Sequence, residues 1–117
     1  MTPIDRLREI CLRMPEAVEK ETWGHPTFRI RDKIFCGCSS EDGDGREFFQ
    51  CSMKAPPGEQ EALLAEGHPF FRPQYVGNKG WIGIVLGPDT DWNEIAELVE
   101  DSYRTIAPKK LSKLLDT

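Results

Sequence analysis

Apolar and polar residues alternate along the chain with two different periods, and the changes of period mark the expected helices and strands. Near the amino terminus the apolar residues recur at helical spacing, on a face made by Ile4, Leu7, Cys11 and Leu12. Thr2 is a suitable cap, Pro3 suits the first helical position, and Asp5 places an acid in the first turn. Pro15 ends this run, because proline disfavours the helical conformation of the residue before it.

The next part of the chain has the period of two that half-buried strands show. Residues 26–31 and 34–39 predict two strands, joined around Asp32-Lys33. A loop rich in glycine and aspartate follows at residues 41–46, and residues 47–53 then predict a third strand. One face of that strand would carry the apolar residues Phe49, Cys51 and Met53.

A second helix and two further strands are predicted in the middle of the chain. The helix covers residues 59–66, and Gly67 lies where helices commonly end in a left-handed conformation. We expect a fourth strand around residues 72–76 and a fifth around residues 81–86. The turn Gly77-Asn78-Lys79-Gly80 would connect these two strands.

The longest helix is predicted to begin at Asp91, with Glu94 three residues later in capping-box spacing. Its apolar stripe comprises Trp92, Ile95, Leu98, Val99, Ser102, Tyr103 and Ile106. Pro108 interrupts the stripe, and residues 109–115 form a short basic amphipathic tail. The order α-β-β-β-α-β-β-α predicts a single α+β domain over residues 1–117, with an antiparallel sheet of about five strands and packed helices.

Charge and composition narrow the classes of partner. The formal net charge is −5 and the sequence pI about 5.0, which disfavours non-specific binding to nucleic acid or anionic lipid. No apolar run approaches the roughly 18 residues of a membrane span. The amino-terminal segment MTPIDRLREI has charges where a signal peptide has an apolar stretch. We therefore expect a cytoplasmic protein without a membrane partner.

The four cysteines predict buried thiols rather than a chemical site. In a cytoplasmic domain they are expected to be reduced, and free cysteine behaves as a small apolar group. Cys36 and Cys38 are two residues apart on a predicted strand, so they would project together beside Cys51. The histidine spacing matches no compact ligand motif, and no nucleophile-elbow or phosphate-loop pattern occurs. We therefore predict no metal site, no cofactor, no catalytic residue and a protein that is not an enzyme.

Both histidines lie in repeated Gly-His-Pro segments, at residues 24–26 and 67–69. A residue before proline is biased toward extended backbone, and a glycine before it permits a sharp turn. Each segment is therefore expected to begin a strand. His25 lies between Trp23 and Phe28 and keeps a functional interpretation, whereas His68 is expected to be architectural.

Four stretches of the chain carry a resemblance to a known family. They are CLRMPEAVEKETWGHPTFRIRDKIF, the His68-Pro69 segment leading to Pro73-Gln74-Tyr75, NKGWIGIVL, and DSYRTIAPKKL. On these stretches the chain resembles the MmcQ/YjbR family over nearly its whole length. The resemblance implies an α-β(3)-α-β(2)-α fold, which agrees with the predicted order. It implies little chemistry, because the family is largely uncharacterised.

Members of that family are described as predicted DNA-binding proteins with a double-wing motif, so the resemblance implies DNA as one partner. The chain departs from the family in two respects. Arg31-Asp32-Lys33 follows Ile30 where relatives often have glycines, and the chain is acidic.

Two hypotheses about function follow from these residues. The first is a binding module that recognises a small ligand or a protein partner around the two predicted hairpins, because residues there mix apolar area with polar tips as binding pockets do. Its candidate residues are Trp23, His25, Arg29, Asn78, Lys79 and Trp81. The alternative is DNA binding by basic residues of a double-wing motif, namely Arg29, Arg31, Lys33, Arg72 and Lys79. The net negative charge favours the first hypothesis over the second.

Overall fold

The computed structural model of the chain describes residues 2–22, 24–40, 49–73 and 77–116. Its strands form one antiparallel six-stranded sheet in the order β1-β2-β3-β4-β6-β5. The strands are β1 (Val18–Thr22), β2 (His25–Ile30), β3 (Lys33–Ser40), β4 (Phe49–Lys54), β5 (Phe70–Phe71) and β6 (Trp81–Leu86). The helices are α1 (Pro3–Leu12), α2 (Gln60–Glu66), α3 (Trp92–Ile106) and α4 (Lys109–Ser112), with 3-10 turns η1 (Gly77–Lys79) and η2 (Lys113–Asp116). The predicted α+β class is confirmed.

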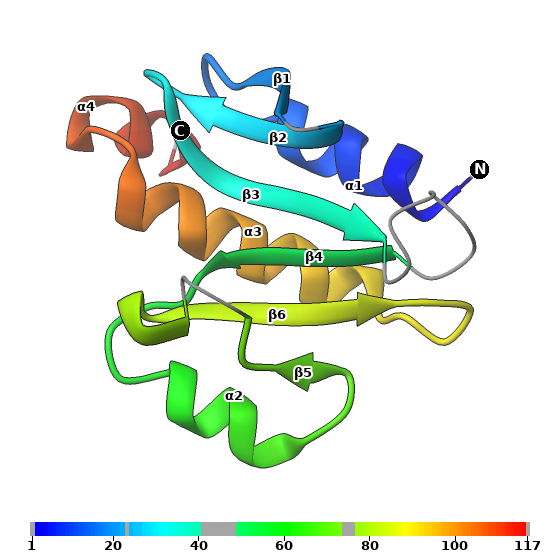
Figure 1. Cartoon of the computed structure of the whole chain (residues 1–117). Helices are drawn as coiled ribbons and strands as arrows, with labels where there is room; N and C mark the ends of the chain where they lie inside the picture. Colours follow the sequence, from blue (N-terminus) through cyan, green and yellow to red (C-terminus); the bar gives the residue numbers. More distant parts are fainter. Residues whose placement is uncertain (1, 23, 41–48, 74–76, 117) are drawn as a thin grey trace.

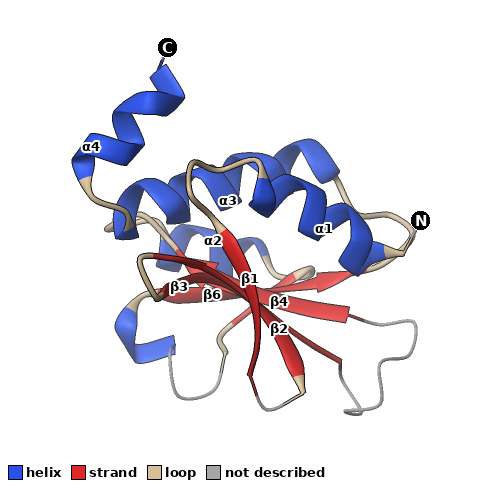
Figure 2. Ribbon diagram, turned by 90° about the horizontal axis from the view of Figure 1, so that it is seen from above, coloured by secondary structure: helices blue, strands red, loops and turns tan. Residues whose placement is uncertain are grey.

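The sheet has one covered face and one open face. Helices α1 and α3 lie side by side against the covered face, and Figure 2 shows them on the same side of the strands. Figure 1 looks onto the opposite face, with the strands in front of these helices. None of the described helices is long and apolar enough to cross a membrane.

Strand register places the core on the helix-covered face. Phe28 lies opposite Cys36, Cys36 opposite Met53, and Met53 opposite Ile82, and all four are fully buried. Partners that lie opposite one another in an antiparallel pair share a face. The helices contribute other fully buried side chains to the same core, among them Leu7, Cys11, Val99 and Tyr103. The alternation of apolar and polar residues predicted for the strands requires such a core on one face of the sheet.

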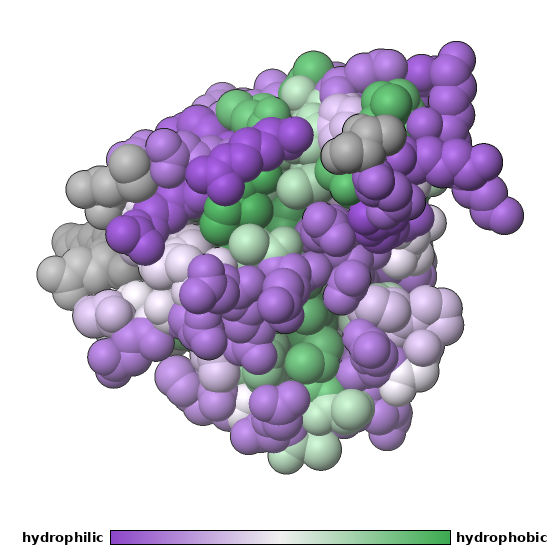
Figure 3. Space-filling view, turned by 180° about the vertical axis from the view of Figure 1, so that it is seen from behind, coloured by the Kyte–Doolittle hydropathy of each residue, from purple (hydrophilic) through white to green (hydrophobic). Residues whose placement is uncertain are grey.

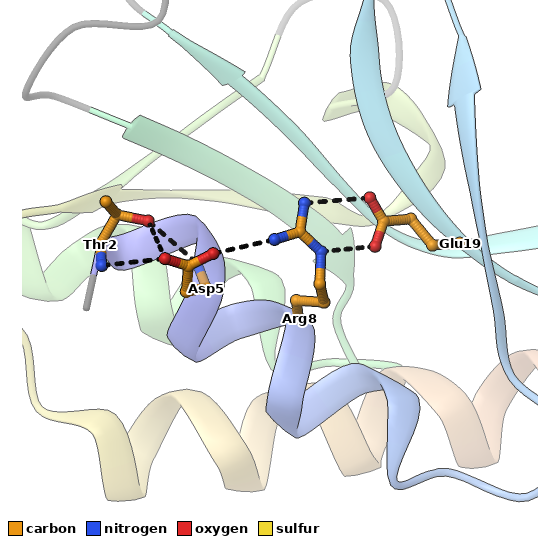
Figure 4. A network of polar contacts seen from close by, with 4 residues as sticks. All are labelled: Thr2, Asp5, Arg8 and Glu19. Carbon is orange, nitrogen blue, oxygen red and sulfur yellow. Dashed lines mark hydrogen bonds and ion pairs between the residues drawn. The ribbon is translucent and has the colours of Figure 1, made fainter.

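The edge strand β1 was not predicted, and it raises the number of strands from about five to six. Its sequence VEKET has almost no apolar residues to alternate, and all but its last residue are exposed. Arg8 of α1 joins it to the helix layer. The guanidinium donates to Glu19 at 2.6 and 3.1 Å and to Asp5 at 2.9 Å (Figure 4). Pairing with β2 and this ion pair therefore define a strand that hydrophobic patterning does not reveal.

Two strand positions differ from the prediction. Strand β5 consists of Phe70–Phe71, before the predicted residues 72–76, of which residues 74–76 lie outside the described part of the chain. The turn between β2 and β3 is Arg31-Asp32, one residue earlier than predicted, with φ of 51° and 67°. A two-residue hairpin turn of type I′ has positive φ at both central positions, and its backbone matches the right-handed twist of the strands.

A bulge in β3 follows from the same pairing. Phe28 lies opposite Cys36 whereas Arg29 lies opposite Ile34, so Phe35 is an extra residue on the bulged strand. The bulge lets the adjacent Phe35 and Cys36 both be fully buried. A strict alternation would have turned one of them to the open face.

The local signals at helix ends and strand starts are confirmed. Thr2 caps α1 together with Asp5, and Asp91 caps α3 by accepting from two backbone amides. The two Gly-His-Pro segments both precede strands, since β2 begins at His25 and β5 directly follows the cis bond before Pro69.

Candidate functional site

The open face of the sheet is made by every second residue of the strands. In β2, Thr27 and Arg29 alternate with Phe28 and Ile30, which are fully buried toward the helices. Register extends this face across the sheet through Lys20, Thr27, Gly37, Ser52, Gly83 and Phe71. The residues on this face come from all six strands.

One end of this face carries three cations and a tryptophan. Arg29 lies opposite Ile34 at the end of β2, and Lys54 lies opposite Trp81 where β4 ends and β6 begins. Lys79, in η1, comes two residues before Trp81. We call Arg29, Lys54, Lys79 and Trp81 the basic sheet end.

The Arg29 guanidinium is held in place by its neighbours on the open face. It donates to Thr22 Oγ1 at 2.8 Å and to Thr27 Oγ1 at 3.2 Å. A longer contact of 3.4 Å joins it to Asp32 Oδ1, and the Arg29 side chain is 14% exposed. The two hydroxyls fix the orientation of the guanidinium, while the distant carboxylate partly balances its charge.

Backbone and side-chain contacts fix η1, and with it Lys79, against the sheet. Lys54 Nζ donates to the carbonyl of Lys79, and Gln60 Nε2 donates to the carbonyls of Gly77 at 2.6 Å and Trp81 at 2.8 Å. The amide of Ala55 also donates to Gly80 at 3.0 Å. Strand β4 and helix α2 thus both hold the turn that carries Lys79.

Lys54 itself is supported from the covered side of the sheet. Its amide donates to Ser102 Oγ at 3.0 Å, and the Ser102 hydroxyl donates to the carbonyl of Phe35 at 2.6 Å. Ser102 is fully buried on α3. One helix side chain therefore ties together β3 and β4 where their backbones leave regular pairing, directly behind the basic sheet end.

The open face of the strands and helices α2 and α3 carry opposite charges. Among the described residues, the outward strand positions include Lys20, Arg29 and Lys54 and no acid. In α2 and α3 acids outnumber cations, with Glu61, Glu66, Glu94, Glu97, Glu100 and Asp101 against Arg104. Partial burial and the neighbouring carboxylate of Glu66 raise the pKa of Glu94. The face is therefore basic in a chain whose formal net charge is −5.

The structure brings together only part of the predicted ligand-binding set. Arg29, Lys79 and Trp81 all lie toward the same end of the sheet, but Arg29 is on β2, three strands away from Trp81 of β6 in the order β2-β3-β4-β6. His25 lies four residues before Arg29 on the same face, opposite Thr22, whose hydroxyl accepts from the Arg29 guanidinium at 2.8 Å. Trp23 lies outside the described residues, and Asn78 belongs to η1, where only its backbone is described.

The predicted DNA-binding set is divided between the two sides of the sheet. Arg29 and Lys79 lie at the basic sheet end, and the exposed Arg72 has its side chain packed over Gly77 of η1. Arg31 donates to Glu16 at 3.1 Å, and Lys33 lies opposite the inward-facing Ile30. The last two side chains thus lie toward the helix layer.

Sequence reasoning missed Lys54, Gln60 and Phe71. In the sequence the polar residues Gln50, Ser52 and Lys54 occupy every second position, but the predicted strand stopped one residue before Lys54. Gln60 and Phe71 had no local signal, because their roles depend on which strands lie beside β6.

Two hollows lie away from the basic sheet end. One of about 370 Å³ is lined by residues of the β6–α3 connection with His68 and Glu94, and one of about 340 Å³ lies between α1 and α3. In the second, the Arg6 guanidinium stands 5.6 Å from the centre of the Trp92 ring. Figure 3 shows the side opposite to that in Figure 1, where hydrophilic residues surround patches of apolar surface. None of the residues of the basic sheet end lines either hollow.

The four cysteines are free and buried in the core. The Cys36 thiol contacts those of Cys11 and Cys51, and the Cys11 contact raises its pKa well above the ordinary value. Burial raises the pKa of Cys38 and of Cys11. Within the described ranges, no group of three or more histidine, cysteine or acidic side chains is arranged to hold a metal ion. The thiols therefore pack as neutral, apolar groups.

Comparison with known proteins assigns the family. The family model described as YjbR matches residues 12–105. The chain belongs to the YjbR family. No curated protein matches it significantly.

Two crystal structures show the same fold as this YjbR chain. A Deinococcus radiodurans protein described with the family domain DUF419 has a TM-score of 0.77 and 20% identity, covering 99% of this chain and 89% of that one. A Pseudomonas syringae protein from a structural genomics consortium has a TM-score of 0.70 and 17% identity, covering 90% of this chain and 98% of that one. At these identities the likeness concerns the fold alone.

Proposed function

We propose that this YjbR chain is a non-enzymatic binding protein, and that its basic sheet end recognises an anionic small ligand or an acidic segment of a protein partner. The observation that carries the proposal is the separation of charge. The open face has Lys20, Arg29 and Lys54 at outward positions and no acid among its described strand residues, although the chain has a net charge of −5. Complementary charge steers an anion to this face and away from the acidic helices.

The basic sheet end also has the rigidity that selective binding needs. The Arg29 guanidinium is oriented by two hydroxyls, and η1 is fixed through Lys54 and Gln60. Groups held in place before binding lose less conformational entropy when a ligand arrives. Trp81 adds half-buried aromatic surface beside these cations. A flat or elongated anion with an apolar part suits this combination.

Charge reversal at Lys79 tests the proposal. Tripolyphosphate, citrate and a glutamate-rich peptide are titrated by calorimetry at low salt, with thermal shift as a second readout. We expect Lys79→Glu to weaken the Kd of the bound probe about tenfold or more, because an attraction becomes a repulsion in the same place. Lys110→Glu on α4 is the matched control, because Lys110 is exposed and its substitution changes the net charge by the same amount. Equal weakening by both variants, or no binding of any probe, would refute the proposal.

Duplex DNA is a second candidate ligand. It is favoured by the position of Arg29 and Lys79, which bring one cation from each predicted hairpin to the same end of the sheet. A double-wing mode also needs Arg31 and Lys33, and Arg31 is paired with Glu16 at 3.1 Å. Binding of a duplex that is lost on Lys33→Glu would support this mode. Binding that Lys33→Glu leaves unchanged would count against it.

A further inference from the structure

Strand β5 places a second aromatic ring on the open face beside Trp81. Phe71 lies opposite Gly83 of β6, and its ring occupies the space that a side chain at Gly83 would fill. Because Gly83 has no side chain, the ring lies across β6. Trp81 is two residues before Gly83 and faces the same side. Both aromatic residues are only partly buried.

The spacing of the two aromatic residues is fixed by the sheet. Phe71 and Trp81 are diagonal neighbours on one face of an antiparallel pair of strands. Residues in this relation lie about 7–8 Å apart. Two planar groups carried by one extended ligand can therefore each stack on one of these two aromatic rings. Aromatic side chains on a sheet surface bind unpaired nucleic-acid bases by stacking. Such stacking depends little on the base sequence.

Basic residues are neighbours of both aromatic residues, in the chain or across the sheet. Arg72 directly follows Phe71, and its side chain packs over Gly77 of η1. Lys54 lies opposite Trp81, and Lys79 precedes Trp81 by two residues. A chain that stacks bases on the two rings would bring its phosphates beside these three cations.

We propose that the basic sheet end also binds single-stranded nucleic acid, with neighbouring bases stacked on Phe71 and Trp81 and phosphates bound by Lys54, Lys79 and Arg72. This inference rests on the anion recognition proposed for the basic sheet end and extends it from a small anion or an acidic segment to a polynucleotide. Bases in a duplex are already stacked on each other, so the rings discriminate against double-stranded nucleic acid. Helices α2 and α3, in which acids outnumber cations, repel phosphate and so favour the open face for the strand.

Fluorescence anisotropy with a labelled twelve-nucleotide oligo(dT) tests the inference, beside a duplex of equal length at the same salt. We expect the single strand to bind at least tenfold more tightly than the duplex. Phe71→Leu should weaken binding of the single strand by about fivefold to a hundredfold, the range for loss of one stacked base. Phe71→Tyr keeps the ring and should keep the affinity. Thermal unfolding of both variants checks that they are folded, and Trp81→Leu provides a second ring deletion.

Titration of tripolyphosphate separates this inference from the proposed function. Lys79→Glu should weaken both tripolyphosphate and oligo(dT), whereas Phe71→Leu should weaken only oligo(dT). Tripolyphosphate binding that depends on Lys79, together with oligo(dT) binding that both Phe71→Leu and Trp81→Leu leave unchanged, would overturn the inference and leave the proposed function standing. Equal affinity for single strand and duplex would also overturn it. Failure of every anion to bind would end both proposals.

Discussion

The two faces of the sheet are built from alternate residues of the same strands, yet they have opposite properties. In β3, Cys36 and Cys38 are buried toward the helices, while Gly37 between them faces the open side. In β6, Ile82 and Ile84 are fully buried, whereas Trp81 lies partly exposed beside Lys54. The covered face supplies stability through apolar burial, and this leaves the residues of the open face available for recognition.

The two faces are nevertheless connected through the backbone. Ser102 on α3 accepts from the amide of Lys54 and donates to the carbonyl of Phe35. The Phe35 ring packs edge-on against Tyr103 at 5.4 Å, and Tyr103 donates to the carbonyl of Pro15 at 2.7 Å. The core side of the sheet thus fixes the backbone from which the basic sheet end projects.

We expect the largest difference between the two faces when the neighbours Phe35 and Ile34 are each truncated to alanine and the losses of stability are compared. Phe35 is fully buried against Tyr103, so Phe35→Ala should lower the free energy of unfolding by about 3–5 kcal/mol. Ile34 is only partly buried on the open side, and Ile34→Ala should cost about 1 kcal/mol. Urea unfolding measures both values. Similar losses would show that the two faces do not differ in burial as described.

The buried thiols predict an effect of pH on the covered face. In the unfolded chain a cysteine loses its proton above about pH 8.5, whereas the raised pKa of Cys51 keeps that thiol neutral in the folded state. Stability is therefore fully present below the unfolded pKa and falls as the pH rises above it. At pH 10 each such thiol should lower the free energy of unfolding by about 1–2 kcal/mol.

Urea unfolding under reducing conditions at pH 7.5 and pH 10 measures this loss, with Cys51→Ala as the comparison. The variant lacks one ionising group in the unfolded state, so its stability should fall less between the two pH values. An identical fall in both proteins would mean that the Cys51 thiol ionises as easily in the folded state as in the unfolded one.

The sequence predicted those parts of the fold that have local chemical signals. The caps at Thr2 and Asp91 predicted the starts of α1 and α3, and the alternation in β2 and β4 predicted their buried faces. Strand β1 was missed because an exposed edge strand needs only a pairing partner and no apolar alternation. The pairing that positions β5 depends on Gly83, which is 12 residues beyond Phe71 in the chain. Such a contact has no signature in either segment alone.

The candidate site was partly predictable for the same reason. The residues Arg29, Lys79 and Trp81 were proposed from their types and their positions near turns, and the fold places them toward the same end of the sheet, with Arg29 three strands away from Trp81. His25 was grouped with them, and it begins β2 opposite Thr22, whose hydroxyl accepts from the Arg29 guanidinium. Lys54 could be recognised only once β4 was known to lie between β3 and β6. The order of the strands was the missing information.

The smallest effect is expected at Asp32, in the turn beside the basic sheet end. Its backbone has a φ of 67°, which glycine adopts without steric cost, so Asp32→Gly should stabilise the fold by about 0.5 kcal/mol. The Asp32 carboxylate lies 3.4 Å from Arg29 Nη1, and its removal should tighten binding of tripolyphosphate about twofold to threefold. Asp32→Asn separates the two causes, because it removes the charge but keeps a side chain in the turn. It should reproduce the gain in affinity with little gain in stability. An Asp32→Asn variant with unchanged affinity would show that this carboxylate does not compete with the ligand for Arg29.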